Sequence, residues 1–391
     1  MASYDRITAE GARDVLFEDC RALRAVERRL RELYRAAGYH EVMTPSMEFF
    51  DVYASGVGAL PQHRLYALTG DSGRLLSLRA DSTKPIARLY AARKDSLRLP
   101  LRLFYNQPVF RRADSYSGRS AEIPQVGAEL LGAGGGLADA EALWLASRSL
   151  SELFGENYRI EIGHAAMYAK LLGEADVPES VRGELTAAVI AKNSPEVRRL
   201  LGEGAERFIA LIELYGDCND VLSRAEKLFG NGAYRETLEY LRRLTDILGG
   251  MGLADKLLLD LGSEGAYGYY TGIVFKGYAG GAEVLSGGRY DTLYGDYGLS
   301  VPAAGFAINC EAACAALPPR AEGGGRQLCV LHCGAGREAD AFGLLGSAAE
   351  GKRIQLSLCK SLEESIDYAR AEGAKRVINL TEDGKAEEIE L

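Results

Sequence analysis

The stretch RLFYNQPVFRRADSYSGRSAEIPQVGAELLG, residues 102–132, carries the clearest signal of the fold. Residues 102–112 and 122–131 alternate between apolar and polar side chains, which is typical of β-strands. The polar segment DSYSGRS lies between them and predicts a hairpin loop. We therefore expect an antiparallel β-hairpin at this point of the chain.

The second strand of this hairpin also indicates a binding site. Gln125, Gly127 and Glu129 share one face, because successive side chains of a strand alternate between faces. A polar residue, a glycine and an acid on one face can leave space for a ligand above the glycine. The same alternation is also the ordinary pattern of a sheet with one face in solvent, so both interpretations stand on this segment alone.

Helical and strand patterns precede the hairpin. Apolar residues between 17 and 37 recur at helical spacing, and Gly38 follows as a C-cap. Residues 75–79 predict a strand. The segment 81–83 then supplies an N-cap for a helix whose first turn tolerates Pro85.

The pattern changes on the C-terminal side of the hairpin. Residues 138–153 predict a helix and 158–162 a strand. From about 174 to 257 the chain is helical throughout, without a strand, which indicates an inserted helical subdomain. Strand patterns return at 267–278 and 301–308.

A segment rich in proline and glycine, residues 317–325, predicts a linker between two domains. We expect a core domain over residues 1–320, which contains the helical insertion. Residues 326–391 alternate between strands and helices and predict a small C-terminal α/β domain.

The composition, 47% hydrophobic and 26% charged, is that of a globular protein. No run of about 18 uncharged apolar residues occurs, so we expect no membrane span. The N-terminal segment lacks the features of a secretory signal or transit peptide, which makes the cytoplasm the expected location. The net charge of −9 argues against strong non-specific binding to nucleic acid, tRNA included.

Four of the seven cysteines form two CxxxC pairs, Cys310 with Cys314 and Cys329 with Cys333. A zinc site is one interpretation of this spacing. The other is that all four are reduced and packed in the core, because free cysteine is among the most buried residue types. We favour the second interpretation and expect neither a metal nor a cofactor.

Four segments together resemble the core of a class II aminoacyl-tRNA synthetase of the histidine type. They are LRADSTKPIARLYAAR at 78–93, FRRADSYSGRSAEIPQVGAELLG at 110–132, EGAYGYYTGIVF at 264–275, and SGGRYD at 286–291 followed by the chain to residue 313. Residues 38–48 resemble motif 1, 102–132 motif 2 and 301–313 motif 3, and the resemblance covers residues 5–315. It implies an α+β fold, in which an antiparallel sheet is flanked by helices and carries the helical insertion.

The resemblance also implies a site for the amino acid histidine. In that family the matching positions hold the α-ammonium (Asp81 and Thr83), the carboxylate (Arg111 and Gln125) and the imidazole (Glu129 and Tyr270), while Tyr269 lines the pocket. The residue types fit these roles, because carboxylates accept from N–H groups and a guanidinium pairs with a carboxylate.

Three departures from the synthetase pattern fall in the part that activates the amino acid. Ala113 stands where an acid contacts adenine, Ala312 where an arginine clamps the γ-phosphate, and Gly265 where an arginine assists activation. Arg111 and Arg119 are retained. Because such cations stabilise charge that develops in the transition state, we expect no catalytic residues.

A histidine site without the catalytic groups resembles the regulatory subunit of ATP phosphoribosyltransferase. The segments LPLRLFYNQPVFR, SGRS and EIGHA and the short C-terminal domain support this resemblance. It implies binding of L-histidine, a short catalytic subunit as partner, feedback control of the first step of histidine biosynthesis, and a homodimer within a hetero-oligomer. A working histidyl-tRNA synthetase and a paralogue that binds another ligand are the alternatives.

Two further residues in these segments have structural interpretations. His164 follows a predicted strand, and we expect it to be a hydrogen-bonded structural histidine rather than a ligand-binding one. Arg289, in SGGRYD, is expected to brace the sheet rather than to touch a ligand.

Overall fold

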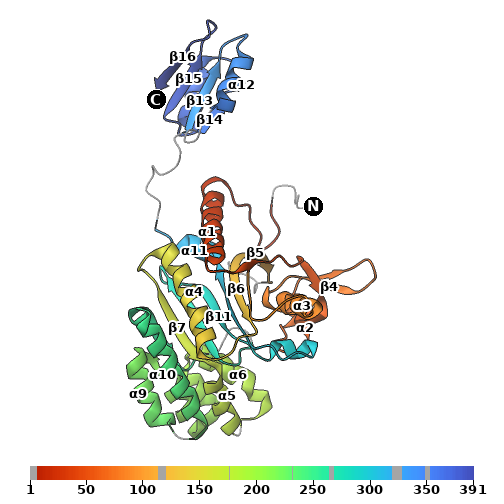
Figure 1. The fold of residues 1–391 in the computed structure, drawn as a ribbon, viewed down its shortest axis with the longest axis vertical. Helices are drawn as coiled ribbons and strands as arrows, with labels where there is room; N and C mark the ends of the chain where they lie inside the picture. The colour runs from red at the N-terminus through yellow and green to blue at the C-terminus, as the bar shows by residue number, and fades with distance from the viewer. Residues whose placement is uncertain are drawn as a thin grey trace. The chain divides into compact units, whose positions relative to one another are not determined.

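The computed structural model describes residues 7–112, 120–175, 177–230, 232–263, 268–318, 328–347 and 353–391. The chain divides into two compact units, residues 1–317 and 318–391. The first unit is built on a nine-stranded sheet, and the second has a sheet of its own. The expected class, an α+β fold with a large sheet flanked by helices and a small α/β domain at the C-terminus, is confirmed (Figure 1).

The large sheet is mainly antiparallel; only the pairs β1–β5 and β7–β9 are parallel. In spatial order its strands are β1 (His40–Glu41), β5 (Leu101–Phe110), β6 (Glu122–Leu131), β12 (Ala303–Asn309), β11 (Ala282–Arg289), β10 (Ile273–Ala279), β7 (Arg159–His164), β9 (Leu257–Asp260) and β8 (Tyr215–Gly216). The hairpin expected from the alternating pattern is the pair β5–β6.

The register of this hairpin decides which side chains meet. Tyr105 lies opposite Gly127, and Gln107 lies opposite Gln125. On its other side β6 pairs with β12, where Gly305 lies opposite Glu129. A polar and acidic face of β6 is thereby bordered by tyrosine and glutamine from one neighbour and by glycine from the other.

Helices cover the opposite face of the sheet. The helices α1 (Phe17–Ala36), α4 (Gly136–Phe154) and α11 (Cys310–Ala316) pack on it (Figure 1). Tyr34 of α1 packs edge-on against Phe104 and Phe306 of the sheet. The apolar spacing that predicts the helix over 17–37 therefore reflects burial of one face of α1 in this core.

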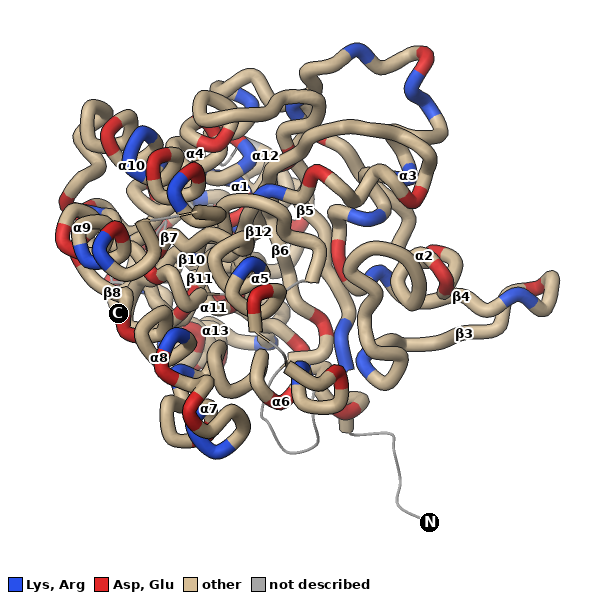
Figure 2. Tube along the Cα trace, turned by 90° about the horizontal axis from the view of Figure 1, so that it is seen from below, with Lys and Arg blue, Asp and Glu red and all other residues tan. Residues whose placement is uncertain are grey.

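The polar face of β6 is covered by a different set of elements. They are α2 (Phe50–Ala54), α3 (Thr83–Arg93), the short helix η5 (Leu293–Tyr297) and a three-stranded sheet of β2 (Met47–Phe49), β4 (Leu75–Leu78) and β3 (Ala67–Thr69). The β3–β4 hairpin projects from the body of the unit (Figure 2). Ile86 and Tyr90 of α3 join Tyr105, Tyr290 and Tyr294 in a second buried cluster.

The helical insertion consists of five α-helices that follow α5 (Ala165–Glu174). They are α6 (Glu179–Ile190), α7 (Ser194–Leu201), α8 (Glu206–Ile212), α9 (Cys218–Phe229) and α10 (Arg235–Gly250). The expectation that the insertion has no strand is wrong in one detail. Tyr215 and Gly216 form β8, which pairs with β9 at the edge of the sheet. Two residues are too few to show a period of two in the sequence.

The second unit is a four-stranded sheet with the order β14-β13-β15-β16. Its elements are β13 (Leu328–Cys333), α12 (Glu338–Ser347), β14 (Arg353–Leu356), α13 (Leu362–Ala371), β15 (Arg376–Leu380) and β16 (Ala386–Glu390). The sequence pattern does not indicate β16, because its residues AEEIE have low strand propensity. Pairing with β15 holds it, with Arg376 bonded to Glu388 at 2.9 Å.

Of the predicted linker 317–325, Leu317 and Pro318 are described, and the remainder lies outside the described residues. No helix in the described part of the chain is long and apolar enough to cross a membrane.

Candidate functional site

One pocket on the polar face of β6 brings together all of the residues that the sequence singles out for ligand binding. These residues are Asp81, Thr83, Arg111, Gln125, Glu129, Tyr269 and Tyr270. Ser82, Tyr105, Ser286, Tyr290, Gly305, Phe306 and Ala307 complete its walls. Segments from four distant parts of the sequence therefore meet in this one pocket.

Asp81 contributes a buried acceptor at the start of α3. Its side chain is buried, and its Oδ1 accepts a hydrogen bond from the backbone N–H of Lys84 at 2.9 Å. Its Oδ2 has no hydrogen-bond partner among the residues that the structure describes. Burial raises the pKa of this carboxyl, and the charges of Arg111 and Lys84 partly oppose the rise. An unsatisfied buried oxygen is costly, so a cationic ligand group at this point would relieve the cost.

Glu129 is the most deeply buried acid of the pocket, with 1% of its surface exposed. Its carboxylate accepts hydrogen bonds from the Thr83 hydroxyl at 2.8 Å and from the Tyr290 hydroxyl. Burial raises the pKa of Glu129 to about 7, although both hydrogen bonds lower it. Near neutral pH this carboxyl can therefore either donate or accept a hydrogen bond.

Glycines make the room that these side chains occupy. A Cβ at Gly305 would lie 1.8 Å from Oε2 of Glu129. A Cβ at Gly288 would lie 2.5 Å from the ring of Tyr270, and one at Gly58 would lie 2.4 Å from the ring of Tyr269. The close packing of the pocket thus depends on positions that lack side chains.

The space above Gly127 is not a ligand space, which corrects one expectation from the sequence. A Cβ at Gly127 would lie 2.4 Å from the Tyr105 hydroxyl oxygen, so the tyrosine of the neighbouring strand fills the gap. Because Tyr105 itself lines the pocket, the glycine still shapes the site, but indirectly. Alternation within β6 cannot reveal a side chain contributed by β5.

Aromatic rings and a guanidinium form other parts of the wall. The rings of Tyr269 and Tyr270 meet edge-on with centroids 5.0 Å apart, and Tyr269 meets Tyr290 at 5.7 Å. Nε of Arg111 donates to the carbonyl of Ala80 at 2.7 Å. Arg111 is thereby tied to the same segment that carries Asp81.

The pocket is nearly closed. Its free volume of about 20 Å³ leaves room for roughly one water molecule. An amino acid can enter only if some of the lining side chains move. The hydroxyls of Thr83 and Tyr290, which satisfy Glu129, are the groups that a ligand N–H would replace.

Comparison with known proteins gives a consistent result. The histidyl-tRNA synthetase family matches residues 11–313. An ATP phosphoribosyltransferase regulatory subunit from Clostridium acetobutylicum is 34% identical over 97% of this chain and 96% of its own length. One from Symbiobacterium thermophilum is 36% identical over 94% of this chain and 95% of its own length. The chain belongs to the family of ATP phosphoribosyltransferase regulatory subunits.

Solved structures agree with this family. An ATP phosphoribosyltransferase regulatory subunit/histidyl-tRNA synthetase from Bacillus halodurans has a TM-score of 0.82 and 26% identity, over 97% of this chain and 99% of that chain. A histidyl-tRNA synthetase from Nostoc has a TM-score of 0.76 at 19% identity, over 99% of this chain and 97% of that chain, and shows the fold alone. Both likenesses extend over the two units of the chain.

The structure describes one of the three departures from the synthetase pattern. Ala312 lies in the first turn of α11, where its backbone N–H donates to Oδ1 of Asn309 at 3.1 Å. Its methyl side chain provides no charge. Ala113 and Gly265 lie outside the described residues, as does Arg119.

Two residues with structural interpretations lie outside the pocket wall. Arg289 is buried and pairs with Asp139 at 2.6 Å and with Asp291 at 2.8 Å. His164 accepts from the Ala166 N–H at 3.2 Å at the start of α5, and burial lowers its pKa to about 4. Both side chains thus support the fold.

The sequence interpretation missed Tyr290, the hydroxyl partner of Glu129. Its segment SGGRYD was singled out as family-like, but attention went to its glycines and Arg289. The signal was present, because residue 290 directly follows strand β11 at the pocket.

The four cysteines of the CxxxC pairs are divided between the units. Cys310 and Cys314 lie in α11, and Cys329 and Cys333 lie in β13. Across the described ranges, no group of three or more His, Cys, Asp or Glu side chains is arranged to hold a metal ion.

Proposed function

We propose that this regulatory subunit binds L-histidine in the pocket at Glu129 and makes the activity of a short catalytic ATP phosphoribosyltransferase subunit sensitive to histidine. The observation that carries the proposal is the pairing of two buried acids in one pocket. Asp81 presents an oxygen without a partner, and Glu129 holds its hydroxyl partners where a ligand could replace them.

The chemistry of histidine matches these groups. Asp81 receives the α-ammonium together with Thr83, and Arg111 with Gln125 receives the carboxylate. Glu129 with Tyr270 holds an imidazole N–H, and the ring of Tyr269 packs beside it. A ligand of this size displaces the hydroxyls that close the pocket, so binding is coupled to a rearrangement.

The same pocket lacks the groups that activate an amino acid. Removal of one cation that stabilises the transition state often lowers the rate by about a hundredfold or more. Two such cations are replaced, by Gly265 and Ala312, and the adenine contact is replaced by Ala113. We infer a protein that senses histidine without turning it over.

Feedback follows if histidine prefers one state of the complex. A ligand shifts an equilibrium only through its different affinities for the two states. Coupling between sites is typically worth about 1–3 kcal/mol. The proposal places a homodimer of this chain in a hetero-oligomer in the cytoplasm, with no role for tRNA.

Two measurements test the proposal. The purified protein should bind L-histidine in calorimetry yet show no histidine-dependent exchange of pyrophosphate into ATP. Mixed with a short catalytic ATP phosphoribosyltransferase subunit, it should form a complex that histidine inhibits. Asp81→Asn should relieve the inhibition while the complex stays assembled.

Other outcomes would assign other functions. Exchange above background would identify a working synthetase. A complex in which Asp81→Asn remains fully inhibited would place the histidine sensor elsewhere. Failure of the unmodified protein to form any complex would favour a paralogue that binds a different ligand.

A further inference from the structure

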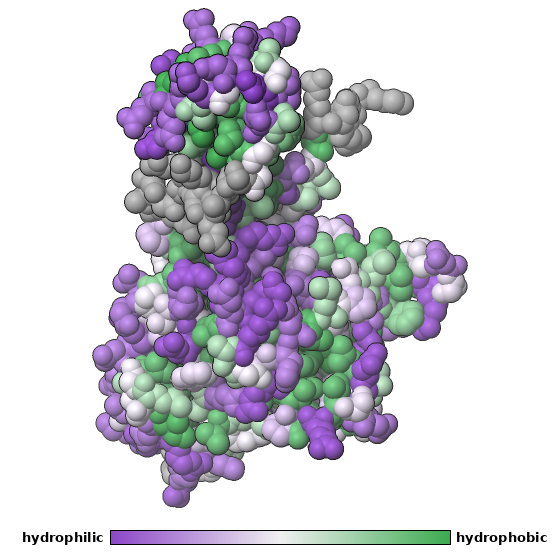
Figure 3. All heavy atoms as spheres, turned by 45° about the horizontal axis from the view of Figure 1, so that its top comes forward, coloured by the Kyte–Doolittle hydropathy of each residue, from purple (hydrophilic) through white to green (hydrophobic). Residues whose placement is uncertain are grey.

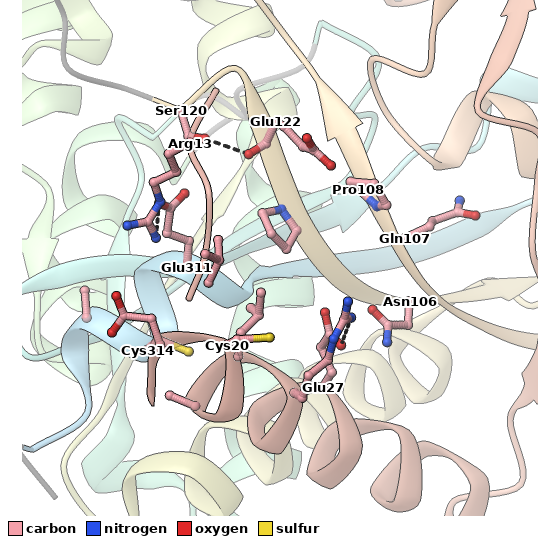
Figure 4. Close-up of a pocket in the computed structure, with 17 residues that line it drawn as sticks. Arg13, Cys20, Glu27, Asn106, Gln107, Pro108, Ser120, Glu122, Glu311 and Cys314 are labelled. Atoms are coloured by element: carbon pink, nitrogen blue, oxygen red, sulfur yellow. Dashed lines mark hydrogen bonds and ion pairs between the residues drawn. The ribbon is translucent and has the colours of Figure 1, made fainter. Parts of the chain in front are cut away.

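The largest cavity of the first unit lies on the face of the β5–β6 hairpin that points away from the histidine pocket. Its volume is about 650 Å³, within the range of ordinary ligand sites. Four segments build it: the N-terminal arm at Arg13 and Val15, helix α1, the hairpin, and helix α11 (Figure 4). None of the ligand functions proposed above uses this space.

The walls of the cavity combine apolar and polar groups. Cys20 and Leu23 of α1 lie across from Pro108 and Pro124 of the hairpin, and Cys314 comes from α11. Figure 4 shows the side chains of Cys20 and Glu27 rising from α1 on one side of this space and those of the strands on the other. Such a cavity can take an extended chain with both apolar and charged side chains.

The charge of the cavity is negative. Its two arginines are paired, Arg13 with Glu311 at 2.7 Å and Arg24 with Glu27 at 2.6 Å. Asp19 and Glu122 also line the cavity, and neither forms an ion pair within the described part of the chain. Their uncompensated charges favour a cationic occupant and disfavour an anionic one.

The cavity is physically connected to the histidine pocket. Gln107 lines the cavity, and its side-chain amide donates to the Ser82 hydroxyl at 3.0 Å. Ser82 lines the histidine pocket. Along β6, Pro124 faces the cavity while Gln125 faces the pocket, so one strand forms a wall of both.

We propose that this cavity is the docking site for a segment of the catalytic subunit that carries lysine or arginine. The inference rests on the proposed function, because that function supplies the partner. A basic segment would pair with Asp19 and Glu122 and would lie against the strand that holds Gln125 and Glu129. Occupation of either cavity would then be felt at the other through shared strands rather than over a distance.

Charge reversal tests the docking site. Asp19→Lys with Glu122→Lys should weaken binding of the purified catalytic subunit at least tenfold, measured by sedimentation at low ionic strength. The matched control is Glu203→Lys with Glu213→Lys, which makes the same change of charge on exposed residues of the helical insertion. Histidine binding by the doubly reversed protein should be retained, which shows that it is folded.

Protection of a thiol gives a second test that needs no variant. Cys20 lines the cavity and is half-buried, and Cys359 of the second unit is comparably exposed. Alkylation of Cys20 by N-ethylmaleimide, followed by peptide mass spectrometry, should slow at least fivefold in the complex. Cys359 serves as the internal reference for the reagent.

The outcomes separate this inference from the proposed function. If the unmodified protein forms no complex with the catalytic subunit, the proposed function itself fails. If it forms the complex, equal binding by the reversed and control variants, or unchanged alkylation of Cys20, overturns the docking site alone. Loss of a homodimer on charge reversal would instead make the cavity an interface between copies of this chain and would also overturn the inference.

Discussion

At the scale of single residues, Glu129 sets both the affinity and the stability of the site. Burial raises the pKa of its carboxyl from an ordinary 4.5 to about 7. Between these values the folded protein holds a proton that the unfolded chain has already lost. The contribution of Glu129 to stability is therefore complete below pH 4.5 and is lost as the pH rises through 7.

Glu129→Gln should remove this dependence on pH. A difference of about 2.5 pKa units corresponds to about 3 kcal/mol, so the variant should gain about that much relative to the unmodified protein between pH 4.5 and 8. Denaturant unfolding of both proteins across this range measures the difference. A difference in unfolding free energy that does not change with pH would show that the carboxyl titrates normally in the folded state.

The same substitution should impair ligand binding. Loss of a charged acceptor at the imidazole costs about 1.5–3 kcal/mol, which lowers the affinity for L-histidine by roughly ten- to a hundredfold. Isothermal calorimetry at neutral pH measures the loss. Glu122→Gln is the matched control, because Glu122 lies on the same strand but lines the opposite cavity. Equal affinities of the two variants would remove Glu129 from the site.

At the scale of the elements, the register between β6 and β12 places a glycine where the buried acid needs it. Glu129 pairs with Gly305, and their neighbours across the two strands are Leu130 with Ala304 and Ala128 with Phe306. A slip by one residue would present a side chain to Glu129 and turn the polar face of β6 toward the helices. The pocket therefore depends on strand register as much as on residue type.

Gly305→Ala tests this dependence. Its Cβ would lie 1.8 Å from the Glu129 carboxylate and 2.6 Å from the backbone carbonyl of Ala128. We expect a loss of about 1–3 kcal/mol in stability and a weaker affinity for histidine, measured by thermal unfolding and calorimetry. Gly183→Ala, in α6 with no neighbour within 4 Å, should instead be neutral or stabilise by up to about 1 kcal/mol. A Gly305→Ala protein that binds histidine normally would show that Glu129 can move away without loss.

At the scale of the whole molecule, an exposed apolar surface indicates self-association. Met43 is 81% exposed, Met47 54%, Leu75 47% and Phe49 42%, and all lie in or beside the three-stranded sheet. Hydrophobic side chains are visible on the projecting part of the first unit in Figure 3. Apolar residues gathered in this way on a surface mark interaction sites, and this surface continues the motif 1-like segment 38–48.

We therefore expect a two-fold homodimer through this surface. Met43→Glu with Met47→Glu should convert the dimer to a monomer at micromolar concentration, because each copy would bury the charges twice in a symmetric interface. Sedimentation velocity measures the change. Phe342→Glu in α12, at an apolar residue that is 63% exposed, should leave the dimer intact. A monomeric unmodified protein would contradict the expectation.

Local sequence patterns were sufficient for many of the elements. The period of two predicts the hairpin β5–β6, and helical spacing predicts α1, because each pattern reflects burial of one face of one segment. The strands β8 and β16 gave no such signal. One is only two residues long, and the other is an acidic strand held by its neighbour.

The sequence by itself determined the residue types of the site and, through resemblance, their grouping. Only the tertiary structure decided how they are arranged: Tyr105 fills the space over Gly127, Tyr290 bonds to Glu129, and one oxygen of Asp81 is left without a partner. The physical reason is that these contacts join residues far apart in the chain. Periodicity reports how one segment meets its surroundings, whereas the identity of the facing side chain depends on strand order and register.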